Sequence, residues 1–184
     1  MTLQEIFAGC TAKPLLAEEP MAKHTSFRIG GPADLMAMPQ SEQELQQLLQ
    51  RAGEAKVPVT LIGNGSNLLV RDKGIRGLVI KLGNMLNDVA VDDCTLTFGS
   101  GVSLAAASRK AAELGLSGME FAVGIPGSIG GAVYMNAGAY DGEMAKVVTG
   151  VRVMELDCTI SELQLLISVI AIQRCRAAVK LLLR

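Results

Sequence analysis

The sequence predicts an α+β fold, with a mixed α/β arrangement as the alternative. Two segments with helical periodicity are separated by several short apolar segments typical of strands. The 20 glycines cluster between apolar residues, which indicates tight turns and close backbone approach rather than flexible linkers. A length of 184 residues is enough for one domain, or for two small lobes that share a ligand.

The first helix is predicted over residues 41–56. Ser41 is followed three residues later by Glu44, the spacing of a capping box that begins a helix. Apolar residues then recur at the spacing of one helical face, at Leu45, Leu48, Leu49 and Ala52. The segment is therefore expected to be amphipathic, with one buried face.

Short strands are expected on both sides of the first glycine-rich loop, at 57–62 and 77–82. Two further strands, within 85–91 and 94–100, are predicted to form a hairpin whose turn carries the solvated pair Asp92 and Asp93.

A second helix is predicted to begin after Ser103 as N-cap and to end at Gly115. After a second glycine-rich loop, the residues 146–156 are expected to form a strand. This order of elements shows no repeat that would indicate a solenoid or a propeller.

Composition argues against several classes of function. A formal net charge of −1 and an aromatic content of 3% do not favour nucleic acid or an anionic membrane as a partner. The apolar run 165–172 is too short to cross a membrane. The first ten residues have neither the basic start nor the apolar core of a signal peptide. We therefore expect a cytoplasmic protein.

A metal site is not indicated. His24 is the only histidine, and none of the cysteines forms a C-x-x-C pair. We expect free thiols, as is usual in the cytoplasm, at Cys10, Cys94, Cys158 and Cys175.

The first candidate site is the loop that follows the strand 57–62. Its glycines permit backbone conformations closed to other residues, and converging amides could hold an anion. Short polar side chains lie between the glycines. The candidate residues are Gly63, Asn64, Gly65, Ser66 and Asn67.

The second candidate site is the loop 124–131. Its glycines leave one surface without side chains, Pro126 fixes the turn, and Ser128 is expected to cap a helix that starts near Ile129. Free amides at the start of a helix suit a phosphate. The candidate residues are Gly124, Ile125, Pro126, Gly127, Ser128, Gly130 and Gly131.

Two such loops suggest a diphosphate held from both sides, and hence a dinucleotide or a flavin nucleotide. Neither loop has the G-x-G-x-x-G or the P-loop spacing, so the residues alone indicate a nucleotide site of a non-Rossmann kind. A purely structural role for both turns is the alternative.

Other polar residues carry weaker signals. His24 has no carboxylate or second histidine beside it in the sequence and is interpreted as a polar loop residue. Glu18 and Glu19 are expected in an exposed loop, and Arg109 and Lys110 on a solvated helix face.

Three segments in the same order, "HTSFRIGGPADLM", "LIGNGSNLLVRDKGIRGLVIKL" and "GMEFAVGIPGSIGGAVYMNAGAYDGE", resemble the UDP-N-acetylenolpyruvoylglucosamine reductases (MurB, UDP-N-acetylmuramate dehydrogenases). The resemblance covers about 24–156 and is closest to the shorter type of that family. It implies the two-lobed FAD-binding fold of vanillyl-alcohol oxidase-like (PCMH-type) flavoproteins. It also implies that both loops contact FAD and that 136–139 lie near the flavin.

The same resemblance implies a reaction. The family uses NADPH and FAD to reduce UDP-GlcNAc-enolpyruvate to UDP-N-acetylmuramate, an oxidoreductase step of peptidoglycan synthesis. This step serves cell wall biogenesis, and through it cell shape and cell division. The flavin carries the hydride chemistry, and the protein binds and polarises the substrate.

The resemblance ends near residue 157, and it divides the chain into four parts. We expect an N-terminal lead at 1–22, FAD-binding lobes at 23–84 and 85–157, and an aberrant tail at 158–184. The family's F-G-Y-R-x-S motif, its serine or cysteine acid and its C-terminal glutamate have no counterpart here. Sequence comparison therefore assigns no catalytic residue and predicts a missing substrate domain.

The tail is interpreted as out-of-frame translation. The genetic code allows the segment from Gln164 to encode A-A-D-F-G-Y-R-N-S-A-L in the neighbouring frame, which contains the missing motif. A genuine helix with apolar spacing at Leu163, Leu166, Ile167 and Ile170 is the alternative. We expect weak FAD binding and no reductase turnover from such a chain; a non-catalytic flavin- or nucleotide-binding module, or a fragment that does not fold, are the other readings.

Overall fold

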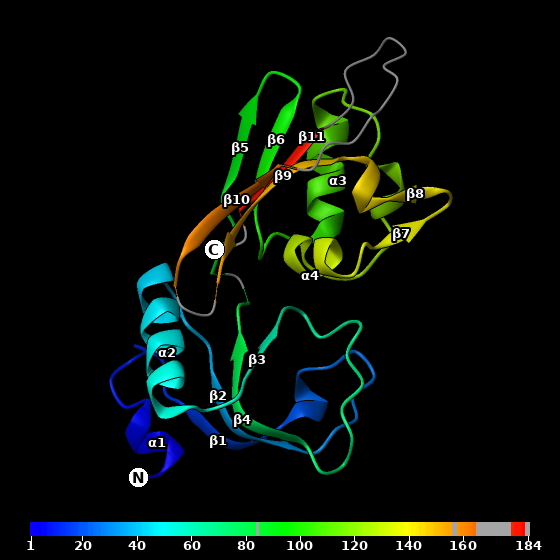
Figure 1. The fold of residues 1–184 in the computed structure, drawn as a ribbon. Coiled ribbons are helices and arrows are strands. Elements are labelled where there is room, and N and C mark those ends of the chain that lie inside the picture. Colours follow the sequence, from blue (N-terminus) through cyan, green and yellow to red (C-terminus); the bar gives the residue numbers. More distant parts are fainter. Residues whose placement is uncertain (84, 156–157, 165–177, 183–184) are drawn as a thin grey trace. The chain divides into compact units, whose positions relative to one another are not determined.

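The predicted α+β class is confirmed in a computed structural model of the chain. The structure describes residues 1–83, 85–155, 158–164 and 178–182. The chain divides into two compact units (Figure 1). Unit 1 comprises Met1–Met85 and Glu155–Thr159, and unit 2 comprises Leu86–Met154 and Ile160–Arg184.

Unit 1 is built on a four-stranded sheet with the order β1-β2-β4-β3. The two outer pairs differ in direction, since β1 runs antiparallel to β2 whereas β3 and β2 both run parallel to β4. The strands are β1 (Leu16–Pro20), β2 (Pro32–Ala37), β3 (Val59–Ile62) and β4 (Ile75–Lys81).

The first predicted helix is present as α2 (Glu42–Ala55), preceded by the short helix α1 (Leu3–Ile6). Ser41 caps α2 by accepting from the amide of Glu44, and the four predicted apolar residues are buried. The Glu44 carboxylate does not complete the expected capping box by accepting from the amide of Ser41. The Glu44 carboxylate instead accepts from the amides of Gln40 and Ala12, so it ties the N-terminal segment to the helix.

An apolar cluster lies on one face of the sheet of unit 1. In parallel strands, paired residues point to the same side, and the pairs Met36–Val79 and Ile62–Lys81 therefore share a face. The 3-10 helix η1 (Met21–Lys23) and the loop after β3 contribute to the same cluster. Its buried members are Met21, Ala33, Met36, Ile62, Val70 and Val79.

Unit 2 contains a five-stranded sheet with the order β10-β9-β11-β6-β5. Its strands are β5 (Val89–Asp92), β6 (Thr95–Gly99), β9 (Val148–Met154), β10 (Ile160–Gln164) and β11 (Ala178–Leu182). The strand β11 runs parallel to both of its neighbours, whereas the outer pairs β5–β6 and β9–β10 are antiparallel hairpin-like pairs.

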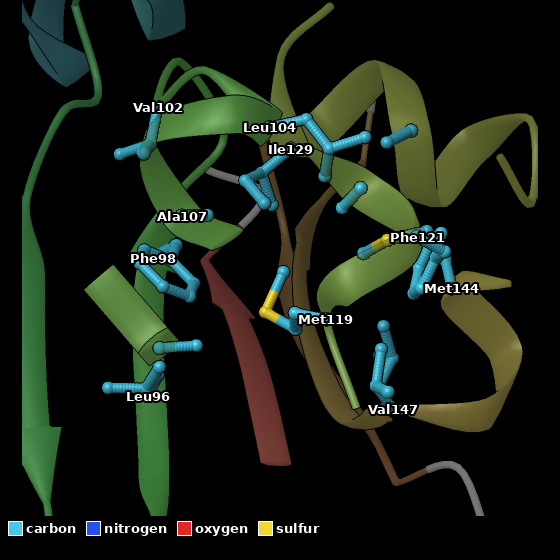
Figure 2. Close-up of a cluster of buried hydrophobic side chains, with 14 of the residues drawn as sticks. Leu96, Phe98, Val102, Leu104, Ala107, Met119, Phe121, Ile129, Met144 and Val147 are labelled. Carbon is cyan, nitrogen blue, oxygen red and sulfur yellow. The ribbon is translucent and has the colours of Figure 1, made fainter. Parts of the chain in front are cut away.

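The helices of unit 2 pack on the core shown in Figure 2. Ser103 caps α3 (Leu104–Glu113), and Ser128 caps α4 (Ile129–Tyr134), both as predicted. The core joins β6 to α3, α4 and the short 3-10 helices η2 (Glu120–Ala122) and η3 (Met144–Lys146). Figure 2 labels Leu96, Phe98, Val102, Leu104, Ala107, Met119, Phe121, Ile129, Met144 and Val147. The small hairpin of β7 (Gly138–Ala139) and β8 (Gly142–Glu143) follows α4.

Several expectations need correction. Glu18 and Glu19 lie in β1 rather than in a loop, because their segment pairs with β2. Cys94 is disulfide-bonded, so the expectation of a free thiol is wrong there, whereas Cys10 and Cys158 form no disulfide. Cys175 lies outside the described residues.

The C-terminal segment forms strands where the structure describes it. Residues 160–164 pair with β9, and 178–182 lie between β9 and β6. Most of the alternative helix, 165–170, lies outside the described residues. Among the described helices, none is long and apolar enough to span a membrane.

Replacing Gly74 with Ala is expected to lower the free energy of unfolding by about 2–4 kcal/mol. Gly74 has a φ of +72°, and a Cβ there would overlap the carbonyl oxygen of Pro32. The matched control is Gly53→Ala in α2, where a Cβ has open space and should raise stability by about 0.5–1 kcal/mol. Urea unfolding of both variants measures the difference, and equal stabilities would contradict the close packing at Gly74.

Candidate functional site

The first glycine loop, Gly63–Asn67, leaves the sheet at the carboxyl end of β3. It passes directly over the backbone of His24 and Thr25. Gly65 has a φ of +68°, and a Cβ on it would overlap the His24 carbonyl oxygen. The Gly65 carbonyl accepts from the amide of Ser26 at 3.1 Å, which fixes the crossing.

A second backbone crossing holds the segment 28–31 against 70–74. The amide of Gly31 donates to the carbonyl of Arg71 at 3.0 Å, and a Cβ on Gly31 would overlap the carbonyl of Asp72. The buried hydroxyl of Thr25 donates to the carbonyl of Ile29 at 3.0 Å and closes the turn between the two crossings. The segment 24–31 is thus crossed twice, once at Gly65 and once at 70–74.

The amides of the first loop are available to a ligand. Within the described part of unit 1, the amides of Gly63, Asn64, Gly65 and Asn67 donate to no protein acceptor. Consecutive amides without protein acceptors around a left-handed residue are the arrangement that binds anions in proteins. The expected anion-binding character of this loop therefore has a structural basis.

His24 lies in a loop, as expected, but it has two polar partners that its neighbours in the sequence do not reveal. Its Nε2 lies 3.0 Å from Glu19 Oε1, and its Nδ1 lies 3.2 Å from the Lys81 Nζ. The imidazole is 12% exposed and the Glu19 side chain 15% exposed. The carboxylate partner was missed because it lies on β1, five residues earlier, where no strand was predicted.

The charges of this cluster perturb one another. The hydrogen bond with His24 lowers the pKa of the Glu19 carboxyl, burial opposes this shift, and the Lys23 ammonium at 3.4 Å lowers the pKa further. Burial lowers the pKa of the Lys81 ammonium. No sequence signal joins Lys81 to His24, since they are 57 positions apart.

The second loop of candidate residues is held by the connection between β6 and α3. The carbonyl of Gly127 accepts from the amide of Leu104 at 3.0 Å, and the amide of Ile129 donates to the carbonyl of Val102 at 2.8 Å. The two chain segments thus form a bridge at Ser103 and Ser128. This bridge places both N-cap serines, of α3 and α4, side by side.

The expectation of free amides at the start of α4 is wrong. The amide of Gly130 donates to the carbonyl of Ser100 at 2.9 Å, and that of Gly131 to the Ser128 hydroxyl. With Ile129 also bonded, the first turn of α4 has its donors satisfied by the protein. The amides of the described loop that keep no protein acceptor belong to Gly124, Gly127 and Ser128.

One buried hydroxyl beside this loop lacks a partner. Ser100 is 2% exposed, and its Oγ is a buried side-chain polar atom without a hydrogen bond among the described residues. Its carbonyl is the acceptor for Gly130, so the orphan hydroxyl sits where β6 meets α4. Sequence reasoning did not single out Ser100, because a serine in "FGSG" carries no local signal.

The segment after α4 is rigidified by one asparagine. Asn136, at a φ of +46°, donates to the Glu143 carboxylate at 3.1 Å and accepts from the amide of Ala145 at 2.9 Å. Two large side chains near it, Tyr134 and Tyr140, are exposed.

No group of three or more potential metal ligands occurs among the described side chains.

Comparison with known proteins identifies relatives along most of the chain. The family described as FAD binding domain matches residues 33–164. The UDP-N-acetylenolpyruvoylglucosamine reductase of Syntrophomonas wolfei is 48% identical over 157 residues, covering 85% of this chain and 52% of the relative. That of Agathobacter rectalis is 53% identical over 155 residues, covering 78% and 49%. The chain thus spans about half the length of these relatives.

Solved structures show the same fold. The UDP-N-acetylenolpyruvylglucosamine reductase (MurB) of Thermus caldophilus superposes with a TM-score of 0.63 at 35% identity, covering 82% of this chain and 52% of that one. A 6-hydroxy-D-nicotine oxidase from Arthrobacter nicotinovorans has a TM-score of 0.64 at 16% identity, over 84% and 36% of the two chains. The resemblance seen in the three motifs is confirmed.

Glu19→Gln is expected to weaken the dependence of the free energy of unfolding on pH in the acidic range. Because the folded-state pKa of Glu19 is lowered, its contribution is present above the unfolded pKa of about 4.3 and is lost as the pH falls through the folded value. Unfolding measured between about pH 5 and pH 2.5 should thus show a weaker pH dependence in the variant. The exposed surface pair offers the control Glu113→Gln, which should leave the curve unchanged. Parallel curves for Glu19→Gln and the wild type would contradict the assignment.

Proposed function

The chain belongs to the FAD binding domain family, and we propose that its two glycine loops, 63–67 and 124–131, both contribute to binding FAD. The observation that carries this proposal is the run of amides in the first loop without protein acceptors. A diphosphate offers oxygens for several such amides at once, and Gly63 and Gly65 themselves carry no side chain.

The residues present fit the cofactor in two further ways. The Lys81 ammonium is a cation in the same unit as the first loop. In the described part of unit 2, the hydroxyl of Ser100 and the amides of Gly124 and Gly127 are polar groups without a protein partner. They are suited to polar atoms of a nucleotide or of a flavin ring. In contrast, the first-turn amides of α4 are bonded within the protein, so this helix offers the shape of its surface rather than hydrogen-bond donors.

We propose that the reaction of the complete protein is the NADPH-dependent reduction of UDP-GlcNAc-enolpyruvate to UDP-N-acetylmuramate. The proposal is supported by relatives that carry the reductase name at 48% and 53% identity. Bound FAD would supply hydride transfer. The residues of this chain would bind and orient that cofactor. A cytoplasmic location and a role in peptidoglycan synthesis belong to the same proposal.

A non-catalytic FAD-binding module is the second candidate. It is favoured by the absence, in these 184 residues, of the F-G-Y-R-x-S motif with which the resemblance associates a catalytic arginine. The two candidates differ in turnover and not in cofactor, so binding and activity are measured separately.

Titration of the purified chain with FAD is expected to show saturable binding by quenching of flavin fluorescence. Gly65→Ala should weaken this binding about tenfold or more, since the loop must move away from the His24 carbonyl. Gly53→Ala, in α2 where a Cβ has open space, is the matched control and should bind like the wild type. If neither protein binds FAD, the proposed function is wrong.

Substrate turnover separates the enzyme from the binding module. With FAD bound, we expect the 184-residue chain to show no NADPH oxidation that depends on UDP-GlcNAc-enolpyruvate, because the catalytic groups implied by the resemblance have no counterpart in it. The assay follows the absorbance of NADPH with and without the enolpyruvyl substrate. Substrate-dependent oxidation would contradict this expectation and would establish reductase activity within these residues.

A further inference from the structure

Together with Lys23, the cluster of Glu19, His24 and Lys81 carries more positive than negative charge. Glu19 accepts from His24 and lies 3.4 Å from the ammonium of Lys23, so its charge already has a cationic partner. Among the described residues, the hydrogen-bond partner of the Lys81 Nζ is the His24 ring, and no carboxylate there lies within salt-bridge distance of it. One cation is thus left without an anion.

The hydrogen bonds define how His24 holds that cation. An ammonium has only donors, so Lys81 must donate to His24 Nδ1. The ring proton then lies on Nε2, where it donates to Glu19. Glu19 therefore selects the imidazole tautomer that accepts from Lys81, and His24 fixes the position of the ammonium.

The topology brings this ammonium to the first glycine loop. Lys81 ends β4 and is paired with Ile62, the last residue of β3, directly before Gly63. The backbone of His24, whose ring holds Lys81, lies against Gly65. Both routes through the fold place the cation beside the amides that have no protein acceptor.

We propose that Lys81 provides the counter-charge for the diphosphate at the first loop, with His24 as the residue that positions it. This inference rests on the proposed function, since it assumes that FAD is the ligand. A diphosphate carries two negative charges, and an ammonium with its hydrogen-bond direction already fixed binds such a group without further ordering.

A purely structural role for Lys81 makes a different prediction. If Lys81 stabilises the fold, replacing it should lower the free energy of unfolding. A desolvated ammonium without a carboxylate instead opposes folding, and its lowered pKa is the expected sign of that cost. Ligand-free Lys81→Met is therefore expected to unfold at the same temperature as the wild type or at a higher one.

Binding of two flavins tests the proposal. FAD carries the diphosphate, whereas riboflavin has the same ring without any phosphate. Lys81→Met should raise the Kd for FAD about tenfold or more and change the Kd for riboflavin by less than about twofold. Lys23→Met removes the exposed lysine, 65% accessible, that touches the same carboxylate, and should bind both flavins like the wild type.

Added salt provides a second readout. Because salt screens charge interactions, the wild-type Kd for FAD should rise more steeply with ionic strength than that of Lys81→Met. Wild-type binding of FAD with an unchanged Kd in Lys81→Met would overturn the inference and leave the proposed function standing. An equal loss of FAD and riboflavin with a lower unfolding temperature would also overturn it. No FAD binding by the wild type would overturn both.

His24 is tested by an exchange that keeps one acceptor. An asparagine places its Oδ1 close to the position of the imidazole Nδ1, whereas a leucine offers no acceptor. His24→Asn should therefore retain FAD affinity within about threefold, and His24→Leu should lose about tenfold, with riboflavin unaffected in both. Equal FAD affinities for the two variants would show that His24 does not position Lys81.

Discussion

The close crossing of two backbone segments in unit 1 determines the shape of the first loop. The segment 24–32 and the segment 65–74 approach so closely that a side chain on Gly31, Gly65 or Gly74 would overlap a carbonyl of the other. Glycine at these positions is a steric requirement rather than a source of flexibility. Since the crossing directs backbone carbonyls and amides, it also decides which donors of the first loop remain without a protein acceptor.

The second loop is built from the same residue types and has a different physical character. Its conformation is held by main-chain hydrogen bonds to the connection between β6 and α3, which use the amides of Ile129 and Gly130. The described part of this loop therefore offers shape and a few polar groups, with no charged side chain of its own. Positive charge is instead found next to the first loop, at Lys81. The two glycine-rich loops thus differ in the groups that each offers, although both are rich in glycine and serine.

Local signals in the sequence predicted the elements that local interactions form. Ser41, Ser103 and Ser128 each accept from the amide three residues later, so their caps could be read directly from the sequence. Pairing between distant segments left no such signal. The strand β1 contains two glutamates and a proline, and it forms because β2 offers it an edge. With that strand unrecognised, Glu19 was placed in a loop, and its contact with His24 could not be foreseen. The bonded amides of Ile129 and Gly130 were missed for the same reason, because their acceptors lie in the turn after β6, at Val102 and Ser100.

The two features that distinguish the first loop both oppose folding of the ligand-free chain. The amide of Gly65, a buried residue, has no protein acceptor among the described residues, and the ammonium of Lys81 is partly desolvated without a carboxylate. Neither feature contributes to the apolar cluster around Met36 and Val79 that stabilises the same face of the sheet. A bound anion would convert both into favourable interactions, since it would accept from the exposed amides and neutralise the ammonium. Ligand binding of this kind stabilises the folded state by mass action, and the stabilisation grows with the free ligand concentration relative to Kd. The ligand proposed for the first loop would thus stabilise the folded state through the same groups that it contacts.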